Sequence, residues 1–234
     1  FVDGSFFYWK YTADLANQLE AMAAGELDPG SSGEDTYGYC FSLKEGLIPK
    51  VGIDIEYALQ DGNRYDVGDV DMFGDDIIGD GAIEKLDSLY YSIEATYEQS
   101  ASDDFGVLDW RIGRILATGT SAGATRQEAF RSPFGSPHGT HGIADLVATS
   151  NVQDTYIGAT TELMETEVDI SLHMLAADQG EDWGQELDIV LRRQQQPDFL
   201  GGWMPLEVGL GKFSSDHITL DSTTFFYVQS NWDF

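Results

Sequence analysis

The chain has 234 residues, of which 41 are acidic and 12 basic, and its formal net charge at pH 7 is −29. A surface this acidic repels a phosphate backbone, so we expect no binding to nucleic acid. The apolar runs are far shorter than the roughly 20 residues that a membrane-spanning helix needs, which excludes a helical membrane protein. The length allows one sizeable domain or two small ones and favours neither, and we take residues 1–234 as a single domain.

The amino-acid composition favours strands and turns over helices. Aromatic residues make up 12% of the chain, and it contains 26 glycines but only 6 prolines. Aromatic side chains are enriched in strands, and glycine is common in the turns between them. Because Cys40 is the single cysteine, no internal disulfide can form.

Ten segments alternate between apolar and polar residues, as strands do when successive side chains point to opposite faces. In 51–59, the clearest of them, the odd-numbered positions are apolar and the positions between them are small or acidic. In chain order the ten segments are 5–12, 37–44, 51–59, 89–98, 108–113, 154–163, 168–174, 186–192, 204–210 and 225–234. Neighbouring segments are expected to pair as antiparallel hairpins.

The connections between these segments alternate between short and long. The short ones are predicted near 45–50, 99–105, 164–167 and 193–203, the last being somewhat longer; the others lie near 13–36, 60–88, 115–153, 175–183 and 211–223. Outer-membrane barrels combine short periplasmic turns with longer external loops. We therefore expect long external loops near 13–36, 60–88 and 115–153, with a short helix over 15–24 in the first of them.

Three features indicate that the apolar face points toward lipid. The opposite face carries many charges, which suits a water-filled interior, and aromatic residues lie near strand ends, as in interfacial girdles. The chain also ends on an aromatic strand, with Phe234 as its last residue. A terminal Phe on such a strand resembles the signal by which bacterial outer-membrane barrels are recognised for insertion. It implies the barrel-assembly machinery, outer-membrane lipid and lipopolysaccharide as partners.

From about Arg131 onward the sequence resembles the C-terminal part of the alginate-export-type family of Gram-negative outer-membrane barrels, many of them porins. The matching stretches are Ser132-Pro133 through His138, 142–145, 154–158, 182–188 and 220–227. The resemblance implies a passive channel. The family's alginate exporter is a larger barrel with a basic conduit, whereas few basic residues occur in the strands here, so alginate is not expected as the solute.

We accordingly predict an all-β fold: an antiparallel up-and-down transmembrane β-barrel of about 10 strands, or part of a larger barrel. The expected function is a porin-like channel in the bacterial outer membrane for passive diffusion of small hydrophilic solutes. The candidate lumen-lining residues are Asp54, Glu56, Glu94, Glu98, Asp109, Arg111, Arg114, Asp169, Glu186, Asp188 and Arg192. Their acidic excess favours cations, as rings of carboxylates do in other pores.

The sequence also contains candidate ligands for a metal ion. Asp69, Asp71, Asp75 and Asp76 crowd one expected loop and offer hard oxygen ligands for Ca²⁺, though without the ligand order of an EF-hand. No other cofactor is expected.

Two histidines, His138 and His141, lie in a glycine-rich loop over 131–150, and no Cys or Glu at ligand spacing accompanies them. We hypothesise that this loop folds into the lumen as a constriction.

No enzymatic activity is expected. His173 and Asp169 share a polar face, but no recognisable catalytic spacing accompanies them. Two alternatives remain: a soluble β-barrel that binds an apolar ligand, in which the apolar face would line a dry core, and an outer-membrane barrel enzyme.

Overall fold

A computed structural model gives the fold of the chain. It describes residues 2–12, 33–43, 48–65, 83–100, 106–120, 128–130, 141–143, 150–195, 204–217 and 221–230. All of its regular secondary structure is β-strand, and none of the described residues forms a helix long and apolar enough to cross a membrane. The expected helix over 15–24, the acidic loop with the four Ca²⁺ candidates, and Phe234 lie outside these ranges.

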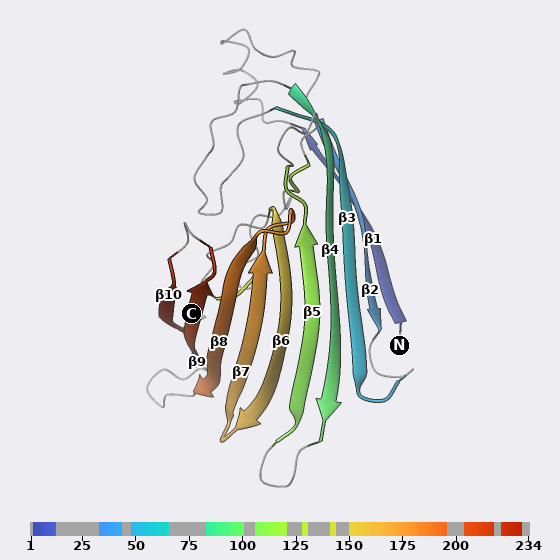
Figure 1. The fold of residues 1–234 in the computed structure, drawn as a ribbon. Helices are drawn as coiled ribbons and strands as arrows, with labels where there is room; N and C mark the ends of the chain where they lie inside the picture. Colours follow the sequence, from blue (N-terminus) through green and yellow to red (C-terminus); the bar gives the residue numbers. More distant parts are fainter. Residues whose placement is uncertain are drawn as a thin grey trace.

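Ten strands form one antiparallel sheet in which each strand pairs with its neighbours in sequence (Figure 1). They are β1 (Val2–Thr12), β2 (Gly33–Leu43), β3 (Val51–Tyr65), β4 (Ile83–Gln99), β5 (Leu108–Ala117), β6 (Val152–Leu163), β7 (Thr166–Ala176), β8 (Asp182–Gln195), β9 (Met204–Ser215) and β10 (Thr223–Ser230). The all-β, up-and-down prediction is confirmed, and each expected segment contributes one strand. β3 and β4 extend well into the segment expected to be the loop 60–88.

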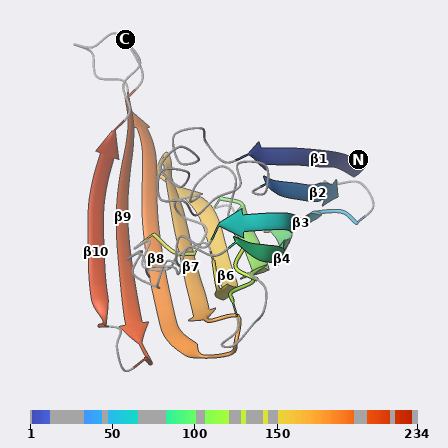
Figure 2. The ribbon, with the colours of Figure 1, turned by 90° about the horizontal axis from the view of Figure 1, so that it is seen from above.

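The sheet is open, and the prediction of a closed barrel is wrong for this structure. Within the described ranges, β1 pairs with β2 alone and β10 pairs with β9 alone, so both are edge strands of this sheet. Figure 2 shows the sheet bending between β4 and β6, so that β1 to β4 lie at an angle to β6 to β10. Alternating polarity specifies how neighbouring strands pair, but it does not specify whether the first strand meets the last.

One face of the sheet, here called the outer face, carries an apolar band. The band consists of two neighbouring rows of cross-strand partners. The first row runs from β2 to β8 through Leu43, Ile53, Ala95, Ile112, Ile157, Leu172 and Leu187. The second runs from β3 to β10 through Val51, Tyr97, Trp110, Ala159, Ile170, Ile189, Leu210 and Phe226. Several of these side chains are exposed, with Ile112 at 56% and Phe226 at 63%.

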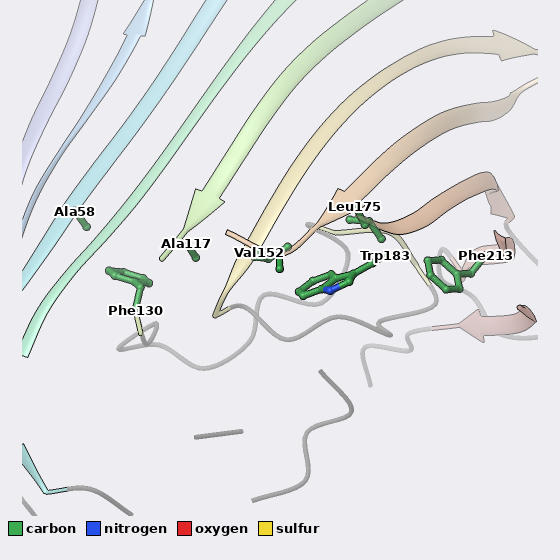
Figure 3. Close-up of a cluster of buried hydrophobic side chains, with 8 residues drawn as sticks. Ala58, Ala117, Phe130, Val152, Leu175, Trp183 and Phe213 are labelled. Carbon is green, nitrogen blue, oxygen red and sulfur yellow. The ribbon is translucent and has the colours of Figure 1, made fainter. Parts of the chain in front are cut away.

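The opposite face, here called the inner face, carries most of the charged strand residues but is not uniformly polar. A buried apolar cluster lies on it, formed by Ala58, Ala117, Phe130, Val152, Leu175, Ala177, Trp183 and Phe213 (Figure 3). Phe130 comes from the long connection between β5 and β6, and its ring stacks on Tyr90 at 5.2 Å. Part of this connection therefore folds back over the inner face, and Phe130 adds its ring to an apolar cluster that the sequence did not predict.

A β-bulge at the start of β8 places Trp183 in this cluster. The register between β7 and β8 shifts so that Leu175 pairs with Gly184 and Ala176 with Asp182, which leaves Trp183 as the extra residue. Gly184 has φ of +141°, and a Cβ there would lie 2.2 Å from the Ser214 carbonyl oxygen. Only glycine fits this position, and the bulge re-aims the indole toward the inner face.

Candidate functional site

The candidate site is a polar network that crosses the inner face from β4 to β10, and Arg192 on β8 links β7 to β9 within it. The Arg192 guanidinium lies 2.8 Å from a Glu167 carboxylate oxygen and 2.7 Å from one of Glu207. A third carboxylate, that of Asp169, lies at 3.6 Å. Glu207 also accepts a 2.5 Å hydrogen bond from the Tyr227 hydroxyl, which extends the network to β10.

Arg111 on β5 continues this network toward β4. Its guanidinium forms a 2.6 Å ion pair with Asp169 and donates a 3.0 Å hydrogen bond to the Thr160 hydroxyl. To reach Asp169 on β7, the side chain crosses β6 directly over Gly158: a Cβ on Gly158 would lie 2.8 Å from the guanidinium carbon. Glycine at this position thus lets an arginine bridge two strands that are not neighbours.

Tyr156 on β6 makes the same kind of crossing in the other direction. Its hydroxyl donates a 2.7 Å hydrogen bond to Glu94 on β4, and its ring passes over Gly113 of β5. The ring also stacks against the imidazole of His173 at a centroid distance of 5.3 Å. Tyr156 therefore connects the charged network to a group of buried polar residues on β6, β7 and β8.

This group consists of Asp154, Ser171, His173, Glu186, Asp188 and His141, each of them at most 6% exposed. His173 is at its centre. Its Nδ1 lies 2.8 Å from Asp154 Oδ2, and its Nε2 lies 3.3 Å from Ser171 Oγ and 3.8 Å from Asp188 Oδ2. His141, from the long connection, lies 3.6 Å from the same Asp154 oxygen. Buried carboxylates are strongly destabilised unless charges or hydrogen bonds compensate them, and the contact with His173 Nδ1 provides such a hydrogen bond for Asp154.

Residues 141–143 hold the long connection against the inner face. The Ile143 amide donates a 3.1 Å hydrogen bond to Asp188 Oδ2. Gly142 has φ of +95°, and a Cβ there would lie about 2.5 Å from the Glu186 carboxylate. Residues 141–143 therefore lie on the inner face, where the hypothesis of a constriction places this loop. Residues 131–140 and 144–149 lie outside the described ranges.

The network and the buried group share one cavity of about 820 Å³ on the inner face. Its charged lining comes from Glu94, Arg111, Asp169, Asp188, Arg192 and Glu207, and Ser171 and His173 also line it. Ile115, Ile143 and Val190 provide apolar wall. The cavity thus combines two arginines, an excess of carboxylates and a hydroxyl–imidazole pair.

The structure brings only part of the predicted lumen-lining set together. Glu94, Arg111, Asp169, Asp188 and Arg192 line the cavity, and Glu186 is buried beside it, under Gly142. Asp54 and Glu56 lie farther along the same face on β3, where Asp54 accepts a hydrogen bond from Ser42. Glu98 pairs with Lys50 at 3.6 Å, and Asp109 is exposed opposite it.

Arg114 lies on the outer face, not on the polar face where it was expected. Cross-strand pairing places it between Ile93 and Thr155, and its guanidinium donates a 2.9 Å hydrogen bond to Gln153. The alternation in β5 puts Arg111 on the inner face, so Arg114, three residues later, must lie on the other face. The sequence pattern already contained this signal.

Metal binding receives no support from the described residues. Within them, no group of three His, Cys, Asp or Glu side chains is arranged to hold a metal ion. Asp69, Asp71, Asp75 and Asp76 lie outside the described ranges, as does His138. The hypothesis of a Ca²⁺ site in that loop stays a prediction.

Sequence reasoning missed the residues that connect the site across strands: Asp154, Tyr156, Ser171, Glu207 and Tyr227. All of them lie on the polar face of predicted strands, which was the available signal. Their grouping depends on strand register, because Tyr156 and Glu94 are 62 positions apart in the chain.

No protein-family model matches the chain, and no curated protein matches it. The resemblance to alginate-export-type barrels therefore rests on the sequence stretches named above and stays a prediction.

Proposed function

We propose that this sheet forms the wall of a porin-like channel in the bacterial outer membrane. The apolar band on the outer face is the observation that carries the proposal. From β3 to β8 both rows pass through neighbouring strands without a charged residue, and many members are about half exposed. The second row continues to β10, whereas the first meets Lys212 on β9. A water-exposed antiparallel sheet normally presents polar side chains on its solvent face, whereas a lipid-facing sheet presents apolar ones.

Aromatic side chains at one edge of this band support a lipid-facing role. Tyr97 and Trp110 are cross-strand partners near the ends of β4 and β5 and are 49% and 40% exposed. The Trp110 indole donates a 2.9 Å hydrogen bond to Gln99. Amphipathic rings with an apolar body and a satisfied polar group are typical of membrane interfaces. Tyr57 is near the end of the predicted segment 51–59, but β3 extends to Tyr65, so Tyr57 lies midway along its strand, where its ring stacks on Tyr39 at 5.2 Å. Not every aromatic residue of the outer face therefore lies at a strand end.

The inner face suits a passage for small hydrophilic solutes, with a preference for cations. Carboxylates outnumber arginines in the cavity lining, and the whole chain carries a formal charge of −29. Fixed negative charge along a narrow polar path attracts cations and repels anions. The proposal also requires the free edges of β1 and β10 to be paired in the membrane, with each other or with further strands, because lipid cannot satisfy backbone hydrogen-bonding groups.

Folding in detergent tests the membrane part of this proposal. The full chain should fold only in micelles or lipid vesicles and should migrate on a semi-denaturing gel at different positions before and after boiling. A chain that stays folded and monodisperse without detergent would contradict the proposal and favour a soluble protein with an apolar ligand.

Planar bilayer recordings test the channel part separately. Reconstituted protein should give discrete conductance steps, and the reversal potential across a salt gradient should indicate cation preference. A folded, lipid-inserted protein without conductance would leave the membrane assignment intact and argue against a channel. An anion-selective current would contradict the proposed role of the inner-face carboxylates.

A further inference from the structure

Ser171, His173 and Asp154 form a hydrogen-bonded chain on the inner face. Ser171 and His173 are two positions apart on β7, so both side chains point to the same face. The distances are 3.3 Å from Ser171 Oγ to His173 Nε2 and 2.8 Å from His173 Nδ1 to Asp154 Oδ2. Asp154 comes from β6, where it pairs with Leu175.

The hydrogen bonds from Ser171 through His173 to Asp154 run in the direction that activation of a hydroxyl requires. The carboxylate of Asp154 accepts a hydrogen bond from Nδ1–H of His173, which leaves Nε2 free to accept the Ser171 hydroxyl proton. Stacking of Tyr156 on the imidazole fixes the plane of the ring. Asp188 Oδ2 lies 3.8 Å from Nε2, the nitrogen that receives the proton.

A cationic group lies beside the hydroxyl. Ser171 pairs directly with Gly158 across the β6–β7 ladder, and the Arg111 guanidinium occupies the space over Gly158 that a side chain would otherwise fill. Directly opposed Cβ positions in an antiparallel pair are only about 5 Å apart. Arg111 is therefore placed to stabilise negative charge that develops on a substrate oxygen next to Ser171.

We propose that Ser171, His173 and Asp154, with Arg111, form a hydrolytic site for neutral carboxylic esters with short acyl chains. The three acidic residues Glu94, Asp169 and Glu207 in the cavity wall disfavour anionic substrates. The apolar lining from Ile115, Ile143 and Val190 offers space for a short acyl group. This inference does not rest on the channel proposal, since the site is complete within the sheet.

The reaction uses water as its second substrate. Ser171 Oγ attacks the ester carbonyl carbon while His173 Nε2 takes the hydroxyl proton, and the carbonyl oxygen becomes an oxyanion beside Arg111. Collapse of this intermediate breaks the ester bond, and His173 returns the proton to the departing alkoxide, which leaves as an alcohol. A water molecule then attacks the acyl-Ser171 carbonyl, His173 takes its proton and returns it to Ser171 Oγ, and a carboxylic acid is released.

Labelling of the full, folded wild-type chain tests the nucleophile without any variant. A fluorophosphonate probe should form one covalent adduct, and peptide mass spectrometry should locate it on Ser171. p-Nitrophenyl acetate should be hydrolysed with a burst of p-nitrophenol that equals the labelled fraction. Absence of an adduct on Ser171, under conditions that label a reference serine hydrolase, would overturn the proposal.

Variants separate catalysis from folding. S171A should abolish labelling and lower kcat by at least about 100-fold, whereas S92A, which removes a serine from the same face of β4, should retain both. D154N should lower kcat with little change in KM, and D154E should restore part of the lost kcat, because Asp154 positions His173 and does not touch substrate. Unchanged hydrolysis in S171A, or equal losses in S171A and S92A, would rule the site out.

Discussion

The phenol ring of Tyr156 lies directly across its cross-strand partner Gly113, where a Cβ would meet the ring at 2.3 Å. Two other pairs repeat this relationship. Arg111 covers Gly158 in the same way, and Tyr227 covers Gly209, where a Cβ would lie 2.0 Å from the ring. In each pair the absence of a Cβ on the glycine lets the large side chain extend across the neighbouring strand. The large side chain in turn covers the backbone of the glycine, which has no side chain of its own.

Filling the space over Gly113 should destabilise the sheet. Gly113→Ala forces Tyr156 off its position and breaks its hydrogen bond to Glu94, which should lower the free energy of unfolding by about 1–3 kcal/mol. Gly4→Ala is the matched control, because its added Cβ would meet only the Cys40 carbonyl oxygen at 3.8 Å. In a Tyr156→Ala background the cost of Gly113→Ala should shrink, as denaturant titrations in a double-mutant cycle would show. Equal costs in both backgrounds would contradict the contact.

A charge in the apolar band should prevent folding in lipid. Ile112→Arg places a charge midway along β5, which should cost about 2–4 kcal/mol if this face contacts the bilayer interior. Met164→Arg, in the β6–β7 turn at 93% exposure, should fold like the wild type. The yield of heat-modifiable protein measures both. If Ile112→Arg instead folds normally and improves solubility without detergent, the face is exposed to water.

Neutralising the inner-face arginines should strengthen cation preference. Arg111→Gln and Arg192→Gln each remove one positive charge from the cavity lining, so the reversal potential across a salt gradient should move toward the cation limit. Arg114→Gln removes the same charge from the outer face and should leave the reversal potential unchanged. A similar shift for all three variants would mean that permeation does not depend on which face of the sheet carries the charge, contrary to our proposal.

The edge strands should gain protection when the protein enters a membrane. No second strand among the described residues pairs with β1 or β10, so the backbone amides of these edge strands should exchange with deuterium faster on average than those of β6 and β7. In lipid vesicles they should become as protected as the central strands, because unpaired amides are not tolerated in hydrocarbon. Hydrogen-exchange mass spectrometry in both conditions gives the comparison. Rapid exchange at both edges in a lipid-inserted protein would oppose the proposed channel wall.

Local patterns were sufficient to predict the strands and their order. In 51–59 the alternation is so regular that both the strand and its two faces follow from it, and β3 is found there with Ala58 and Gln60 on the inner face. The bulge at Trp183 could not be found this way, since one extra residue changes the face without changing the composition. Closure of the sheet could not be predicted from local patterns either, because it depends on strands at opposite ends of the chain.

The site illustrates the same limit at the level of single residues. The sequence placed His173 and Asp169 on one polar face but could not show which carboxylate lies next to the imidazole. The structure pairs His173 with Asp154 at 2.8 Å, while Asp169 binds Arg111 and Arg192. Which carboxylate meets the imidazole is decided by the register between β6 and β7, and register depends on the turn at Met164 and Glu165, where both residues have positive φ.

Every strand contacts chiefly the strands that precede and follow it in sequence. An arrangement of this kind can gain or lose a whole hairpin at either side while all remaining pairings keep their register. The width of the sheet is thus a property that gene duplication or deletion can change in steps of two strands, without altering the pairing among β5 to β8.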